Sequence, residues 1–122
     1  MTLEPKKPIL TEDQEQLALV RYLELLKLQH KILIFTSHGD NMRTTIGTAV
    51  KFKKLGKRKG YPDFTIVTTR GELIYIELKR SKGGITSSEQ KEWIAALNTV
   101  RNVGACVCKG FDEAKLFLNL YV

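Results

Sequence analysis

The chain has 122 residues, of which 43% are hydrophobic and 27% charged, and its formal net charge is +7 at pH 7. This length suits one domain with a single core. No apolar run approaches the roughly 20 residues of a membrane span, and the N-terminus lacks the apolar region of a signal peptide. We therefore expect a cytoplasmic protein without a membrane partner, and its positive charge favours a polyanion such as nucleic acid.

The N-terminal part is predicted to be an arm followed by a helix. Residues 1–10 contain two prolines and two lysines and are expected to be flexible, so that residues 11–122 form the single domain. Thr11 is a favourable N-cap, and Gln14 stands at the capping-box position. The helix is expected to end near Gln29, and its apolar stripe consists of Leu19, Val20, Leu23 and Leu26.

A short strand at residues 31–36 leads into a long segment, residues 37–60, that is rich in Gly, Asn, Thr and Lys. Long loops in compact domains are commonly functional, and this one is expected to contain a short helix near residues 45–54. Its second half concentrates basic side chains just before an aspartate, which favours contact with a phosphate backbone over a merely solvated loop. The residues expected to contact DNA are Lys53, Lys54, Lys57, Arg58 and Lys59, and Lys51 belongs to the same basic run.

Residues 64–69 and 73–79 are typical of two strands joined by a turn. Side chains alternate along a strand, so Ile74, Ile76 and Leu78 share one face of the second strand. Its other face carries Tyr75, Glu77 and Lys79. Asp63 stands at the start of the first strand, and the turn is expected to bring it to Glu77.

Asp63, Glu77 and Lys79 form the candidate catalytic set. Two carboxylates bind a hard cation such as Mg²⁺ through oxygen, and a nearby ammonium positions water or stabilises developing charge. A carboxylate inside an apolar strand is costly unless it is paired or bound to metal. The alternatives are a turn aspartate at Asp63 and an exposed ion pair between Glu77 and Lys79.

The rest of the chain predicts a helix, a strand and a final helix. The helix begins at Ser87 or Ser88 and ends near Asn102, and it is followed by a strand at residues 104–108 and a helix at 111–120. The predicted order is therefore α-β-β-β-α-β-α, with an additional short helix in the long segment. Cys106 and Cys108 are interpreted as buried thiols.

Three motifs together resemble the PD-(D/E)xK nuclease superfamily. They are Pro62-Asp63, the E-x-K of residues 77–79, and the Ser-Ser-Glu-Gln-Lys of residues 87–91. The combination looks like the VRR-NUC branch, in the small stand-alone form carried by phages and bacteria, and it spans about residues 11–118. The resemblance implies an α/β fold with a restriction-endonuclease-like core, in which helices flank a central mixed sheet.

The resemblance also implies a site for Mg²⁺ or Mn²⁺. Asp63, Glu77 and the main-chain carbonyl of Leu78 would bind the metal, and Lys79 would assist the attacking water. Gln90 matches a downstream glutamine of the family, and it fits a capping-box residue of its own helix equally well.

A glutamate of the first helix would complete the metal ligands. An E-x-x-x-Q motif recurs there in the family, and Glu12 with Gln16 fits it, both on one helix face. Glu15 is the alternative, because it shares a face with Leu19 and Leu23. The structural explanation is that acidic residues in a first turn interact favourably with the helix dipole.

The implied function is a metal-dependent, structure-specific DNA endonuclease in a bacterial or phage-infected cell. Some members of the branch act on Holliday junctions as homodimers. No Gly-rich phosphate loop is present, so no nucleotide cofactor is expected. The alternatives are a non-catalytic basic nucleic-acid-binding module and a restriction-type, sequence-specific endonuclease.

Two tyrosines and two histidines lie near this set of residues. Core packing is the favoured interpretation of Tyr61 and Tyr75, with contact to a ribose or base as the alternative. His30 and His38 lack the spacing of a zinc-binding pair, so neither is expected to bind metal.

Overall fold

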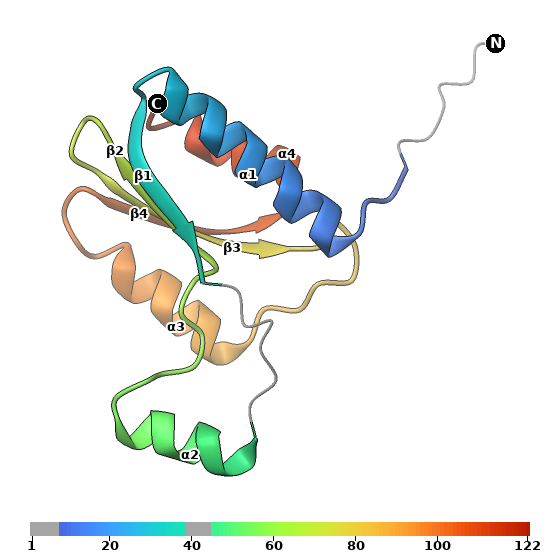
Figure 1. Ribbon diagram of the computed structural model, residues 1–122, viewed down its shortest axis with the longest axis vertical. Coiled ribbons are helices and arrows are strands. Elements are labelled where there is room, and N and C mark those ends of the chain that lie inside the picture. Colours follow the sequence, from blue (N-terminus) through green and yellow to red (C-terminus); the bar gives the residue numbers. More distant parts are fainter. Residues whose placement is uncertain (1–7, 39–44) are drawn as a thin grey trace.

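The computed structural model describes residues 8–38 and 45–122 and shows a four-stranded sheet flanked by helices (Figure 1). The predicted α/β class and element order are confirmed, with α2 in place of the short helix expected in the long segment. Residues 1–7 of the expected arm lie outside the described part, so the domain boundary stays a prediction. The elements are α1 (Glu12–Leu28), β1 (Ile32–Ser37), α2 (Ile46–Lys54), β2 (Phe64–Thr68), β3 (Leu73–Lys79), α3 (Ser88–Leu97), β4 (Val103–Lys109) and α4 (Phe111–Leu118).

The sheet is mixed and its strands lie in sequence order, β1-β2-β3-β4. Strand β2 pairs antiparallel with both β1 and β3, whereas β4 runs parallel to β3. A parallel neighbour requires a crossover connection, and α3 lies within it. The β2–β3 turn is closed by Thr68, whose Oγ1 accepts a hydrogen bond of 3.0 Å from the Glu72 amide, and by Gly71 at φ 88°. This hairpin fixes the register on which the candidate site depends.

The first helix forms as its sequence predicts. The Thr11 side chain accepts from the Gln14 amide, and the Gln14 side chain accepts from the Thr11 amide, which together make the capping box. Leu19, Leu23 and Leu26 are buried along one stripe. Truncating a leucine buried in this way costs about 2–5 kcal/mol in comparable cores.

Two helices cover one face of the sheet and one covers the other. Helices α1 and α4 pack together on the first face, while α3 lies against the second (Figure 1). The main core lies on the α1/α4 side, where it includes Phe64, Ile66, Ile74 and Ile76 from the hairpin. Figure 1 shows α2 standing apart from the sheet, beyond α3. No helix in the described ranges has the length and apolar composition needed to cross a bilayer.

Candidate active site

The β2–β3 hairpin brings Asp63 and Glu77 together, as its register requires. Phe64 pairs with Ile76, so the residues flanking that pair lie opposite each other. The Asp63 amide donates a 3.1 Å hydrogen bond to Glu77 Oε2, and the Leu78 amide donates a 3.0 Å bond to Asp63 Oδ2. Each carboxylate is therefore held by the backbone of the opposite strand.

Lys79 and Gln90 both approach the same oxygen of Glu77. Lys79 Nζ lies 3.5 Å from Glu77 Oε1, and Gln90 Nε2 donates a short hydrogen bond to that atom. Gln90 Oε1 accepts a 3.0 Å bond from the Ser87 amide at the start of α3. Gln90 thus completes the capping box of α3 and also contacts Glu77, so the two interpretations of this residue hold together.

The two carboxylates are hard to ionise together. Burial is the largest cause that raises the pKa of Asp63, opposed first by the Leu78 amide. Burial and then the charge of Asp63 raise the pKa of Glu77 to about 7, against the opposing effect of Lys79. Glu77 is 3% exposed, so little water screens this repulsion. A cation between the carboxylates would relieve it.

These residues fit a divalent metal ion. Carboxylate oxygens are the ligands that Mg²⁺ and Mn²⁺ prefer, and each carboxylate offers lone pairs beyond those used in the hydrogen bonds above. The described residues contain no ready-made group of three His, Cys, Asp or Glu side chains around one point. Asp63 and Glu77 are thus a two-carboxylate site that needs further oxygen ligands.

The two helix-1 candidates differ in their surroundings. Glu12 is exposed, and its charge contributes to the raised pKa of Asp63. Glu15 is 5% exposed and accepts a short hydrogen bond from the Phe111 amide at the first residue of α4. A Cβ on Gly110 would lie 3.3 Å from both Glu15 carboxylate oxygens. Glu15 thus caps α4, whereas Glu12 remains the candidate ligand.

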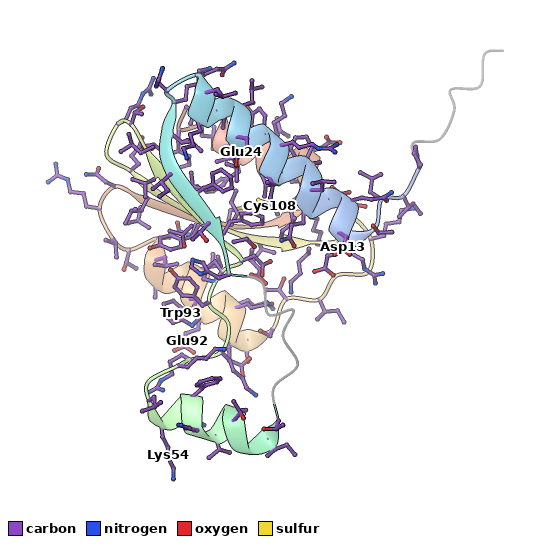
Figure 2. The ribbon with its side chains drawn as sticks, viewed as in Figure 1. Asp13, Glu24, Lys54, Glu92, Trp93 and Cys108 are labelled. Atoms are coloured by element: carbon purple, nitrogen blue, oxygen red, sulfur yellow. The ribbon has the colours of Figure 1, made fainter. Side chains whose placement is uncertain are left out.

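A basic arm, defined here as residues 45–59, leaves the body beside this site. Its helix α2 buries no residue, and Figure 2 shows Lys54 pointing away from the rest of the chain. The arm is fixed at its base, where Trp93 Nε1 donates a 2.9 Å hydrogen bond to the Lys59 carbonyl. Gly60 (φ 90°) follows, and a Cβ there would lie 2.5 Å from the carbonyl carbon of Glu89. All five predicted DNA-contacting residues lie on this arm and are exposed: Lys53, Lys54, Lys57, Arg58 and Lys59.

Comparison with known proteins identifies the family. Residues 10–112 match the VRR-NUC domain. The chain belongs to the VRR-NUC family. It is also similar to a solved structure described as a VRR_NUC domain protein, with 26% identity and a TM-score of 0.62 over 95% of this chain and 91% of that one. No curated protein gives a significant match.

Membership of the VRR-NUC family implies a nuclease of the PD-(D/E)xK type, whose substrate is DNA and whose members typically use a divalent metal. The recognition made from the motifs is confirmed, as is the mixed sheet with flanking helices. The roles of individual residues stay predictions. The geometry brings four of them together, namely Asp63, Glu77, Lys79 and Gln90.

The sequence reasoning missed an arrangement of rings beside the VRR-NUC site. Tyr61 lies next to three other aromatic side chains, those of His38, Tyr75 and Trp93. Neither tyrosine belongs to the main core cluster. Tyr61 is 38% exposed, so the core interpretation was wrong for this residue, whereas Tyr75 is half-buried beside it. A usable signal was present, because each tyrosine stands two residues before a candidate metal ligand, Asp63 or Glu77.

Proposed function

We propose that this VRR-NUC protein is a Mg²⁺- or Mn²⁺-dependent endonuclease that cuts branched DNA. The observation that carries the proposal is the convergence of Asp63, Glu77 and Lys79 on one hairpin, where the buried Glu77 and the half-buried Asp63 lie beside an ammonium group. A structural ion pair would need one carboxylate. A second one, paired with the first at a cost in electrostatic repulsion, is explained by a cation that binds both.

The chain's own groups have distinct roles in this mechanism. Asp63 and Glu77 would hold the metal, with Glu12 and the Leu78 carbonyl as further candidate ligands. When bound, the cation would supply Lewis-acid polarisation of the phosphate and make a water molecule more acidic. Lys79 orients the attacking water or donates to a phosphate oxygen as negative charge develops. Gln90 holds the Glu77 carboxylate in position through its side-chain amide.

The basic arm is the proposed DNA-binding surface. It carries six Lys and Arg residues and no Asp or Glu between positions 45 and 59. Such a surface binds the phosphate backbone regardless of sequence. Family likeness further suggests products with a 5′-phosphate and a 3′-hydroxyl.

Branched DNA and a homodimer are the finer parts of the proposal. The described part of one chain holds one such site, and a two-fold dimer would present two sites to two strands. The edge strand β1 exposes Leu33 and Ile34, each to 59%, which is apolar surface that a second copy would cover. Light scattering is expected to give about twice the chain mass of 13.9 kDa. A monomer at micromolar concentration, with and without DNA, would remove the dimer from the proposal.

One cleavage panel tests the activity. Linear duplex, single strand, flap and four-way junction are each incubated with Mg²⁺, Mn²⁺ or EDTA, using wild type and Glu77→Ala. We expect metal-dependent cutting of the branched substrates by wild type only, with Glu77→Ala still folded by circular dichroism. Wild-type cutting by Glu77→Ala would exclude the proposed site. Binding to DNA without cutting in any metal would favour the non-catalytic module instead, and cutting of linear duplex at one sequence would favour the restriction-type alternative.

A further inference from the structure

Four rings on the α3 side of the sheet form a group that the proposed hydrolysis does not use. We call this the aromatic cluster: His38, Tyr61, Tyr75 and Trp93. Tyr61 is its centre, with ring centroids 5.1 Å from His38, 6.0 Å from Tyr75 and 5.1 Å from Trp93. The interplanar angles are 83°, 87° and 81°, so all three neighbours lie nearly perpendicular to the Tyr61 ring. Such edge-to-face contacts hold a ring in a defined orientation.

Polar contacts hold the cluster as well. Thr65 Oγ1 lies 3.3 Å from the Tyr61 hydroxyl and 3.1 Å from His38 Nε2. Trp93 is tied to the base of the basic arm through its bond to the Lys59 carbonyl, and Figure 2 shows it on α3. The cluster is thus fixed between the sheet, α3 and the arm.

The aromatic cluster is not part of the hydrophobic core. None of its four members belongs to the main core or to the half-buried side chains packed against it. Tyr61 remains 38% exposed despite its three ring contacts. The cluster joins α3 to the sheet, and the exposed part of the Tyr61 ring is open to a ligand.

The aromatic cluster lies next to the candidate active site on the same segments of the chain. Three segments each contribute one residue to the cluster and one to the candidate active site. The segment before β2 carries Tyr61 and Asp63. Strand β3 carries Tyr75 and Glu77, and helix α3 carries Trp93 and Gln90. Residues two apart on a strand share a face and are separated by about 7 Å, and residues three apart on a helix share a face. The cluster therefore lies one side-chain position along the same surface from the carboxylates.

We propose that Tyr61, held by the rest of the aromatic cluster, is a stacking platform for an unpaired nucleobase next to the phosphate that is cut. Aromatic side chains bind bases that are out of a duplex stack, and they do so with little regard to sequence. The basic arm beside the cluster supplies the charge that brings a DNA strand there. A fully paired base keeps its stacking partners and is not available to Tyr61.

This inference rests on the proposed nuclease function and narrows its substrate. The preferred DNA has at least one unpaired nucleotide beside the cut, as in a flap or an open branch point. A perfect duplex lacks that nucleotide and is expected to bind only through its phosphates.

The experiment uses 2-aminopurine, whose fluorescence is quenched by stacking, at each unpaired position of a flap in turn. The full chain is titrated into the labelled DNA in a buffer that contains Ca²⁺ in place of Mg²⁺. A denaturing gel checks that the DNA strands stay intact. Wild type and Tyr61→Phe are expected to quench the probe at one position. Tyr61→Leu should not quench it, and its affinity for the flap should fall about tenfold while its affinity for duplex is unchanged.

The control variant is Tyr22→Leu, which removes a half-buried tyrosine from the α1/α4 side of the sheet. It should lose stability and keep both quenching and affinity. Should Tyr61→Leu fail to fold, the DNA is changed instead: an abasic site at the quenched position should weaken wild-type binding about tenfold, whereas one further along the flap should not. Equal binding of intact and abasic flaps, or equal quenching by Tyr61→Leu, would overturn the proposal.

The two proposals fail differently. Position-specific quenching without cutting in any metal would support the platform and reject the nuclease. Metal-dependent cutting without quenching that depends on Tyr61 would support the nuclease and reject the platform.

Discussion

The carboxylate site and the basic arm are neighbours built on different principles. Asp63 and Glu77 each accept a backbone hydrogen bond from the opposite strand, and Glu77 is almost wholly buried. The arm buries no residue of its helix α2 and is tied to the body mainly at its base, through Lys59 and Gly60. The carboxylate site holds its oxygen atoms in fixed positions, whereas the basic arm presents exposed positive charge.

The difference follows from what each region is proposed to do. Chemistry at phosphorus depends on atoms held within a fraction of an ångström. Attraction to a phosphate backbone acts over about 8–10 Å in physiological salt and tolerates a variable position. We therefore expect substitutions at the site to change the rate at saturating DNA, and substitutions on the arm to change binding.

After the loss of cutting in Glu77→Ala, the largest effect is expected from Lys79→Ala. It removes the ammonium beside Glu77, and loss of one donor to developing charge costs about 10²- to 10³-fold in rate. Single-turnover cleavage at saturating DNA and Mg²⁺ measures it. Lys109→Ala is the matched control, because Lys109 is the register partner of Lys79 on β4 and is exposed. Equal losses in both variants would show that Lys79 acts only through net charge.

The second prediction distinguishes two roles of Gln90, which are to position Glu77 and to cap α3. Gln90→Ala removes both a capping-box bond and the bond to Glu77, and loss of such a supporting contact costs about 10- to 100-fold in metal affinity or activity. Gln14→Ala removes the equivalent capping-box bond from α1, 2.9 Å long, without removing a hydrogen bond to Asp63 or Glu77. Both variants should lose similar stability in thermal unfolding, and only Gln90→Ala should lose cleavage. Equal losses of cleavage in the two variants would show that Gln90 acts only as a helix cap.

These two glutamines show which features of the structure can be predicted from residues that are close together in sequence. Ser/Thr with Gln three residues later predicted both capping boxes, and strand alternation predicted which side of β3 carries Glu77 and Lys79. The hairpin then follows from its turn, which places Asp63 beside Glu77. Each of these predictions depends on residues close together in sequence.

Contacts between distant segments were not predictable in this way. The burial of Glu15 beside Leu19 follows from helix periodicity, but its partner is the Phe111 amide, 96 residues away. The only hint is that Gly110 precedes α4 and has no side chain with which to cap it. The aromatic cluster likewise joins four separate segments, and it becomes visible only once the sheet and α3 are assembled.

A third test uses pH to examine the repulsion at the site. The raised pKa of Glu77, about 7, means that its contribution to stability in the metal-free protein is present below its ordinary pKa of 4.5 and is lost as pH rises through 7. Metal requires the ionised form, so apparent metal affinity should fall by up to about tenfold for each pH unit below 7. The rise in melting temperature on adding Mg²⁺ should be large at pH 8 and small at pH 5.5.

Glu77→Gln is the control for this pH dependence. It keeps a side chain of the same shape and removes the titrating group, so its Mg²⁺-induced shift should be small at both pH values. An equally large shift for wild type at pH 5.5 and pH 8 would contradict a metal site built on these two carboxylates.

The smallest effect on the rate at saturating DNA is expected from the arm. Replacing Lys57, Arg58 and Lys59 by Gln should change that rate less than about twofold, because none of them is part of the hydrogen-bonded site. Binding should weaken, and the slope of log affinity against log salt should become shallower by about 0.9 for each residue that contacts a phosphate. Fluorescence anisotropy over a salt series measures this slope.

Net charge alone is the competing explanation for the arm. Replacing Lys27, Lys31 and Arg70 by Gln removes the same three charges from the opposite end of the sheet, where the Lys31 carbonyl accepts from Thr69. If the arm contacts DNA directly, this distal variant should keep the wild-type salt slope. Equal slopes in both triple variants would mean that the chain binds DNA through its overall field, and the division between a region that fixes atoms and a region that presents charge would then hold for the carboxylate site alone.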